Sequence, residues 1–181
     1  MEYELRAKKV KMIVFDVDGV LTGGELFLGA EGEVLKTFHT QDGLGITAAH
    51  RAGLKTAIIT GRSSEMVRSR AAELAIADVF QGSLDKVSSL RQLLEKYGLE
   101  IDEIGYVGDD LNDLAVIGVV GLACAVANAV PEVKAAVHFV ASCHGGHGAV
   151  REVIEMVLKA QGKWDMVVES YRNPGAVNAG Q

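Results

Sequence analysis

The stretch MIVFDVDGVLT, residues 12–22, carries a run of apolar residues directly into two aspartates and a glycine. Four consecutive apolar residues are typical of a strand that is buried on both faces of a parallel sheet. Burying one unpaired carboxylate costs free energy, and two carboxylates close together also repel each other. We therefore expect Asp16 and Asp18 to lie at the end of this strand, where they share a site with a cation.

Short apolar runs alternate with amphipathic stretches along the rest of the chain, and this alternation predicts the fold class. The expected strands after the first are KTAIIT (55–60), ADVF (77–80), EIGYVG (103–108), VGLACAV (120–126) and HFVA (138–141). The expected helices are residues 43–53, 64–75, 83–98, 110–118, 131–137 and 148–162. Strands that alternate with helices form right-handed units with a parallel sheet. The sequence therefore predicts an α/β fold, a three-layer doubly wound parallel sheet covered by helices on both faces.

One segment departs from this alternation and predicts a hairpin. ELFLGAEGEVLKTFH, residues 25–39, has a turn at residues 30–32 between two apolar stretches, so we expect a small β-hairpin flap over about residues 23–40. The segment between Asp18 and Thr60 is too short for a separate cap domain. We expect a single domain over residues 1–162. Residues 163–181 end in the small, polar stretch SYRNPGAVNAGQ and are predicted to be a flexible C-terminal tail.

Composition excludes several classes of partner. The net charge is −6, and the isoelectric point is about 5.4. This charge argues against nucleic acid as the main partner, although a local positive cluster could still bind a small anion. No signal-peptide pattern and no apolar run long enough for a membrane span is present in the sequence. Neither of its two cysteines, Cys124 and Cys143, has zinc-like spacing, and we expect a soluble protein of the reducing cytoplasm with no membrane partner.

Polar residues follow each of the central predicted strands, and ligands of open α/β sheets bind at this carboxyl edge. Asp16 and Asp18 follow the first strand, the Thr60-Gly61-Arg62 turn follows the second, and the GDDLND stretch with Asp109 follows another. Lys86 lies near the start of an expected helix. Each feature is weak alone, but all of them in this order, each after a strand or at a helix start, are hard to obtain by chance.

The residue types at this edge indicate phosphoryl transfer. Asp16, Asp18 and Asp109 offer the hard oxygen ligands that Mg²⁺ prefers. The Thr60-Gly61 turn and the Lys86 ammonium supply a hydrogen bond and positive charge for a phosphate. One aspartate can attack phosphorus, while a second protonates the leaving oxygen and then activates water.

These residues resemble the haloacid dehalogenase superfamily of phosphohydrolases. The family pattern is DxD after the first strand, Thr or Ser after the second, Lys on a later helix and GDxxxD after a further strand. This chain matches it with Asp16 and Asp18, Thr60, Lys86, and Asp109 with Asp113. The resemblance implies a haloacid dehalogenase-like, Rossmann-like fold. It also implies Asp16 as nucleophile, Asp18 as general acid/base, and Mg²⁺ held by Asp16, the Asp18 backbone carbonyl and Asp109.

The stretches FDVDGVLTGG, GEVLKTFHTQDGLGI, IITGRSSEMVRSRAAEL and GGHGAVREV are similar to the capless branch that contains the 3-deoxy-D-manno-octulosonate 8-phosphate phosphatases. This resemblance implies Mg²⁺-dependent hydrolysis of that sugar acid phosphate, for lipopolysaccharide biosynthesis. It also implies a homotetramer in which hairpins pack together and a neighbouring subunit covers each active site. The substrate-binding residues that it implies are His39, Thr40, Gln41, Asp42, Gly43, Arg62 and Arg70, with Arg70 reaching in from the neighbour.

Departures from the branch pattern keep the substrate open. Gln41, Thr47 and His147 stand where the octulosonate enzymes usually carry arginine. A related branch acts on the 9-phosphate of 2-keto-3-deoxynononate, but it carries Glu at the position of Arg62, which favours the eight-carbon acid here. Outside enzymes, a phospho-receiver domain also has an acidic Mg²⁺ site with Thr and Lys, and a regulatory protein could keep the fold without activity. A receiver, however, places its phosphoacceptor after the third strand and has no use for Asp18.

Overall fold

A six-stranded parallel sheet forms the centre of the molecule. The computed structural model describes residues 2–173, and its main sheet has the strand order β5-β4-β1-β6-β7-β8. The paired strands run parallel throughout. The strands are β1 (Met12–Phe15), β4 (Lys55–Ile59), β5 (Asp78–Phe80), β6 (Ile104–Gly108), β7 (Leu122–Ala125) and β8 (Phe139–Val140). The predicted doubly wound fold is confirmed.

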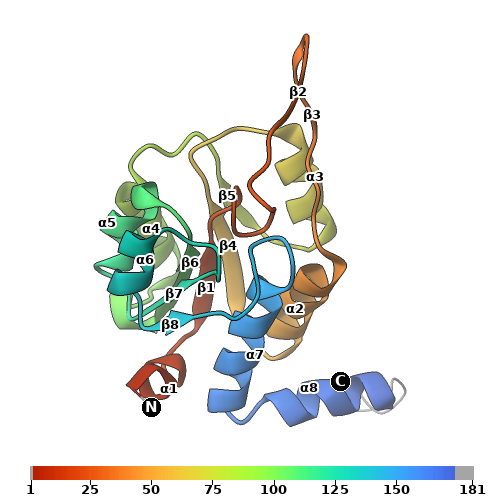
Figure 1. Cartoon of the computed structure of the whole chain (residues 1–181). Helices are drawn as coiled ribbons and strands as arrows, with labels where there is room; N and C mark the ends of the chain where they lie inside the picture. The colour runs from red at the N-terminus through yellow and green to blue at the C-terminus, as the bar shows by residue number, and fades with distance from the viewer. Residues whose placement is uncertain (1, 174–181) are drawn as a thin grey trace.

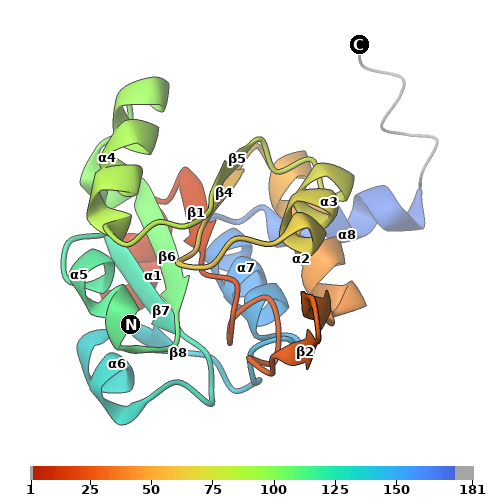
Figure 2. The same cartoon turned by 90° about the horizontal axis from the view of Figure 1, so that it is seen from above.

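Helices cover both faces of this sheet, as the two views in Figures 1 and 2 show. One face carries α4 (Lys86–Tyr97), α5 (Leu114–Ile117) and α6 (Pro131–Ala136). The other face carries α2 (Thr40–Arg51), α3 (Glu65–Glu73) and α7 (Ala149–Ala160). Short 3₁₀ turns, η1 (Ile101–Glu103) and η2 (Leu111–Asp113), flank β6. Strand β1 lies between the two layers with all four of its residues buried, as its continuous apolar run predicts.

The register of the three central strands brings three chain segments to one edge. Phe15 at the end of β1 pairs with Ile58 of β4 on one side and with Val107 of β6 on the other. The residues that follow these strand ends, Asp16, Thr60 and Asp109, therefore lie at the same carboxyl edge. This edge is the place where an open α/β sheet binds its ligand.

The predicted hairpin is present and rises above this carboxyl edge (Figure 1). Strands β2 (Phe27–Gly29) and β3 (Gly32–Leu35) pair antiparallel and form a separate two-stranded sheet. Most of their side chains are exposed, including large apolar ones. Lys36, directly after β3, is the exception, because it is buried where the hairpin meets the body of the protein.

Helix α4 shows why one of the predicted helices forms where it does. The Asp85 side chain accepts a hydrogen bond from the Ser88 backbone N–H and so caps the first turn. Gly98 ends the helix in the left-handed conformation, with φ of 60°, where glycine is favoured. The cap at Asp85 makes Lys86 the first residue of α4, at the edge of the sheet where Asp16 lies.

Two helices lie where no element was predicted. α1 (Glu2–Ala7) contacts α7 and β7 ahead of the first strand. α8 (Trp164–Arg172) occupies most of the described part of the segment predicted to be a flexible tail. It packs back on the body because Val167 is buried and the guanidinium of Arg51 lies 4.2 Å from the centre of the Tyr171 ring. Residues 174–181 lie outside the described residues. Within the described residues, none of the helices is both long and apolar enough to span a membrane.

Candidate active site

A cleft of about 230 Å³ opens at the carboxyl ends of β1, β4 and β6. It brings together five of the six residues that the sequence predicted for catalysis, metal binding and phosphate binding. Its lining consists of Asp16, Asp18, Gly19, Gly24, Thr60, Gly61, Arg62, Asp109, Asp110 and Asn112. Of the predicted catalytic, metal and phosphate residues, only Lys86 is not part of this lining, because its ammonium is buried between the Asp16 and Asp113 carboxylates.

Asp16 is almost completely buried, with 3% of its surface exposed, and both of its carboxylate oxygens have partners. The Val17 backbone N–H donates to Oδ1 at 2.7 Å, and the Lys86 Nζ lies 2.8 Å from Oδ2. Burial raises the pKa of Asp16, and the nearby Asp113 charge raises it further, while Lys86 opposes both effects. The lysine therefore favours the ionised carboxylate that a nucleophile needs.

Lys86 is itself held between two carboxylates. Its Nζ lies 2.6 Å from Asp113 Oδ1, and the Tyr106 hydroxyl donates to that same oxygen at 2.6 Å. Burial alone would lower the pKa of Lys86, but the charges of Asp16 and Asp113 reverse this effect and raise it. The ammonium thus stays charged in a buried position, where it faces the nucleophile.

Asp113 holds Lys86, Tyr106 and the backbone at Asp109 together on the buried side of the site. It is completely buried, and its second oxygen accepts the backbone N–H groups of Asp109 and Asp110 at 2.8 and 3.4 Å. The sequence motif contained Asp113 without a role, and Tyr106 was part of an apolar strand pattern. Only the fold reveals that the Tyr106 hydroxyl meets Asp113, because that contact depends on how β6 and η2 pack.

Asp16 and Asp109 form the part of the cluster best suited to a metal ion. One carboxylate oxygen from each of Asp16, Asp109 and Asp113 lies within 4.8 Å of the others. Burial, together with the charges of Asp113, Asp16 and Asp110, raises the pKa of Asp109 to about 7. A cation bound there would favour the ionised carboxylate and so oppose both the burial and the repulsion.

The backbone next to Asp18 completes this arrangement. Gly19 has a φ of 86°, and a Cβ atom there would lie 1.9 Å from Asp109 Oδ2. The glycine therefore allows the Asp109 carboxylate to approach the peptide that follows Asp18. Asp113 is less suited to be a ligand, because both of its oxygens already accept hydrogen bonds. Asp16, Asp109 and the backbone at Asp18 fit the ligand preference of Mg²⁺ for oxygen.

Asp18 lies in a different environment from Asp16, at the mouth of the cleft. Its side chain is 22% exposed and forms an ion pair through Oδ1 with the Lys36 ammonium of the hairpin. On the other side, Arg62 Nε lies 3.8 Å from Asp18 Oδ2. Sequence reasoning missed Lys36, because a lysine at the end of an exposed hairpin gives no signal of burial.

The Thr60-Gly61 turn forms the opposite wall of the cleft. Thr60 is 2% exposed, and its backbone N–H donates to the Phe80 carbonyl at 2.9 Å, which fixes the turn to β5. A Cβ atom on Gly61 would meet no heavy atom within 4 Å. The space beside Gly61 is therefore open to a ligand that sits between this turn and Asp16.

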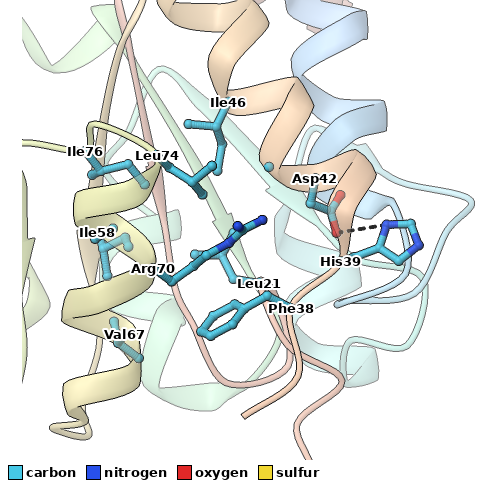
Figure 3. A pocket seen from close by; sticks show the side chains of 12 residues that line it. Leu21, Phe38, His39, Asp42, Ile46, Ile58, Val67, Arg70, Leu74 and Ile76 are labelled. Atoms are coloured by element: carbon cyan, nitrogen blue, oxygen red, sulfur yellow. Dashed lines mark ion pairs between the residues drawn. The ribbon is translucent and has the colours of Figure 1, made fainter.

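The remaining predicted substrate-binding residues lie apart from this cleft. His39, Asp42, Gly43 and Arg70 line a separate, narrow pocket among apolar side chains, as Figure 3 shows. The structure places residues 40–43 in the first turn of α2 rather than in a loop, with Thr40 and Gln41 exposed.

Two of these residues have structural partners within the chain. Asp42 is 2% exposed and accepts the backbone N–H groups of Gly148 and Arg151, at 3.2 and 2.8 Å, at the start of α7. Arg70 extends across α2, where a Cβ atom on Gly43 would lie 2.3 Å from its Nη2. Arg70 also pairs with Glu73 at 2.8 Å. In this chain alone, neither Asp42 nor Arg70 reaches the cleft around Asp16.

Comparison with known proteins agrees with this fold. Residues 71–154 match the family model of the haloacid dehalogenase-like hydrolases. The chain is 42% identical over 160 residues to the 3-deoxy-D-manno-octulosonate 8-phosphate phosphatases of Salmonella typhi and Escherichia coli K12. Each match covers 88% of this chain and 85% of the relative.

Solved structures give the same result. The Moraxella catarrhalis 3-deoxy-D-manno-octulosonate 8-phosphate phosphatase, in complex with a magnesium ion, a phosphate ion and the sugar acid, superposes with a TM-score of 0.91. It is 41% identical and covers 94% of this chain and 98% of its own. The Yersinia pestis enzyme gives a TM-score of 0.89 at 38% identity, covering 91% and 89%. The chain belongs to the haloacid dehalogenase-like hydrolases and, among them, to the family of the 3-deoxy-D-manno-octulosonate 8-phosphate phosphatases.

Proposed function

We propose that this protein hydrolyses 3-deoxy-D-manno-octulosonate 8-phosphate to the free sugar acid and phosphate in a Mg²⁺-dependent reaction. The observation that carries the proposal is the Asp16 carboxylate, which faces a cleft with Lys86 on one of its oxygens and Asp109 beside it. These are the groups that phosphoryl transfer through an aspartyl-phosphate requires. Relatives with the same overall fold bear the name of this activity.

The first half of the reaction forms a covalent intermediate on Asp16. A carboxylate oxygen of Asp16 forms a bond to phosphorus, while the bond between phosphorus and the sugar oxygen breaks. The protonated Asp18 gives its proton to that leaving oxygen, so the sugar departs as an alcohol. Lys86 and the Val17 N–H keep Asp16 in one orientation.

The second half releases phosphate. Asp18, now ionised, takes a proton from water as the water oxygen attacks phosphorus, and the bond between phosphorus and Asp16 breaks. The Thr60 hydroxyl, the open backbone at Gly61 and the Lys86 ammonium hold the phosphate oxygens. Asp16, Asp109 and the Asp18 carbonyl would hold Mg²⁺, which supplies positive charge against the phosphate oxygens.

The assembly that we propose is a homotetramer in which a neighbouring subunit covers each active site. Five large apolar side chains of the hairpin segment are between 40% and 63% exposed: Leu26, Phe27, Leu28, Val34 and Leu35. An apolar patch of this kind marks an interaction surface. Such an assembly would also let Arg70, which lies outside the cleft of its own subunit, contact the sugar acid of a neighbouring subunit. We further propose that the enzyme works in the cytoplasm.

The test is phosphate release from a panel of phosphorylated sugars, with Mg²⁺ and again with EDTA. The panel includes the 8-phosphate of 3-deoxy-D-manno-octulosonate and the 9-phosphate of 2-keto-3-deoxynononate. Metal-dependent turnover that favours the eight-carbon acid supports the proposal. Preference for the nine-carbon acid would keep the chemistry and overturn the substrate, and would make Gln41, Thr47 and His147 the first residues to examine for specificity. No turnover on any compound by the folded protein would overturn the enzyme function.

A further inference from the structure

The hairpin places a buried cation against Asp18. The Lys36 side chain is 1% exposed, although it directly follows a strand whose residues are mostly exposed. Its ammonium pairs with Asp18 Oδ1 and lies 2.9 Å from Glu33 Oε1. A buried ammonium is stable only with such partners, so the two carboxylates determine where Lys36 lies.

The carboxylate of Glu33 is anchored in turn to the body of the protein. Its Oε2 accepts a hydrogen bond from the Ser64 hydroxyl at 2.7 Å, and the Ser64 backbone N–H donates to the Gln81 side chain at 2.6 Å. Ser64 precedes α3, and Gln81 follows β5. A continuous set of polar contacts therefore runs from the edge of the sheet through the hairpin to Asp18.

The geometry gives the two oxygens of Asp18 different surroundings. Oδ1 forms an ion pair with the buried Lys36 ammonium, whereas Oδ2 lies 3.8 Å from Arg62 Nε. Asp18 itself lines the cleft. Asp18 follows the strand in a loop and has no regular element to orient it. The Lys36 contact restricts the rotation of the carboxylate and leaves the other oxygen for the leaving group or water.

We propose that Lys36 is a positioning residue that holds the Asp18 carboxylate in the orientation needed for proton transfer, and that Glu33 and Ser64 act through Lys36. The proposal rests on the proposed phosphatase function. The same contacts connect the hairpin to the acid/base group, so a displacement of the hairpin would change the orientation of the Asp18 carboxylate.

The test compares Lys36→Met, which keeps most of the length of the side chain without its charge, with Lys36→Arg, which keeps the charge. Proton transfer by a positioned group contributes roughly 10²–10⁴-fold to rate, so a partial loss of positioning should lower the kcat of Lys36→Met by about 10- to 100-fold. KM should change less, because no substrate contact is removed. Lys36→Arg should recover a large part of kcat. Glu31→Gln, at the exposed hairpin turn, is the matched control and should behave as wild type.

A double-mutant cycle separates positioning from general damage. If Glu33 acts through Lys36, Glu33→Gln should lower kcat in the wild-type background and change it little in the Lys36→Met background. Acid quenching followed by intact-mass measurement should show more aspartyl-phosphate in Lys36→Met than in wild type, because its hydrolysis also needs Asp18. Mg²⁺ binding measured by calorimetry should be unchanged.

The proposal is overturned if Lys36→Met keeps the wild-type kcat. It is also overturned if Lys36→Met lowers kcat and Tm and raises KM together, and Lys36→Arg recovers none of these losses. If wild type releases no phosphate from any substrate, the proposed function fails. Hydrogen exchange then tests whether the Lys36 contact orders the segment around Asp18. Faster exchange in residues 16–20 and 27–36 of Lys36→Met than of Glu31→Gln would support the contact as the element that orders Asp18. Equal exchange would overturn it.

Discussion

Opposing electrostatic effects act on the pKa of Asp16. Burial and the Asp113 charge favour its neutral form, while Lys86 and the Val17 N–H favour the carboxylate. Removing one partner of a buried charge cluster leaves the others uncompensated, but Lys86 would still have Asp113 at 2.6 Å. The charge of Asp16 can therefore be removed without leaving the lysine unpaired.

We predict that Asp16→Asn nearly abolishes phosphate release and leaves the protein folded. An amide cannot act as the nucleophile, so kcat should fall by at least about 10³-fold, on the scale seen for lost covalent catalysts. The Tm of the metal-free protein should stay equal or rise, because one of several repelling carboxylates is gone. Phosphate release and thermal denaturation measure the two effects. Asp165→Asn, an exposed change on α8, controls for the change in charge, and retained activity in Asp16→Asn would refute the nucleophile assignment.

The raised pKa of Asp109 predicts how metal binding depends on pH. Its pKa of about 7 in the metal-free protein lies above the ordinary value of 3.8. A carboxyl whose pKa is raised on folding contributes stability that is complete below about pH 4 and is lost as the pH rises through about 7. Bound Mg²⁺ requires the ionised form and offsets this loss.

The expected result is a Mg²⁺-induced rise in Tm that is larger at pH 8 than at pH 6. Thermal denaturation with and without Mg²⁺ across this range provides the measurement. Asp109→Asn should lose most of the Mg²⁺ effect and its pH dependence, because the group that titrates is gone. An equal Mg²⁺ effect at both pH values in wild type would contradict the assignment of Asp109 as a ligand.

Among the elements, the loop between β8 and α7 packs closely against the loop that carries Asp18 and Gly19. The Gly146 N–H donates to the Val20 carbonyl at 2.9 Å, and the Gly145 N–H donates to the Asn128 side chain at 2.9 Å. A Cβ atom on Gly145 would lie 1.7 Å from the Gly19 carbonyl oxygen. The two loops can approach this closely only because position 145 has no side chain.

We predict that Gly145→Ala displaces the loop that carries Asp18 and Gly19. Overpacking of this kind costs typically about 1–3 kcal/mol, and the opposing atom is backbone, which cannot move alone. Both Tm and kcat should fall, as measured by thermal denaturation and phosphate release. Gly118→Ala is the control, since its Cβ would have its nearest contact, the Leu114 carbonyl oxygen, at 3.4 Å. If Tm and kcat fall by the same amount in the two variants, the close approach at Gly145 does not hold the loop of Asp18 and Gly19 in place.

The elements also separate what the sequence predicts from what only packing determines. β1 and α4 were predictable, because a continuous apolar run and an amphipathic helix ending in Gly98 are local signals. α1 and α8 were missed, since they are short and owe their stability to contacts far away in sequence, such as Tyr171 against Arg51.

The same distinction applies to the site. The meeting of Asp16, Thr60 and Asp109 followed from the rule that parallel strands end at one edge. The pairing of Lys36 with Asp18 and of Tyr106 with Asp113 did not follow, because neither the burial of a hairpin lysine nor the direction of a strand tyrosine is encoded in local periodicity. These contacts arise only when distant elements pack.

On the scale of the whole molecule, the hairpin is the feature that a single chain leaves unexplained. The Leu28 and Val34 side chains are 63% and 61% exposed on an element that projects above the active-site edge (Figure 1). Exposed apolar side chains on a short two-stranded sheet also leave that sheet with little to stabilise it. Packing of hairpins from several copies would bury these side chains and stabilise the element at once.

We predict that the wild-type protein has four times the 19.2 kDa mass of one chain in solution and that Leu28→Lys reduces this mass. A charge buried in an apolar interface without a partner opposes association, while the fold of each subunit should persist because Leu28 is exposed within it. Light scattering coupled to size exclusion measures the mass, and circular dichroism checks the fold. Leu5→Lys, an equally exposed leucine on α1, is the control and should leave the mass unchanged. If a neighbouring subunit completes each site, the dissociated Leu28→Lys variant should also lose activity and regain part of it at high protein concentration. A wild-type mass of 19.2 kDa would show that the hairpin serves another purpose.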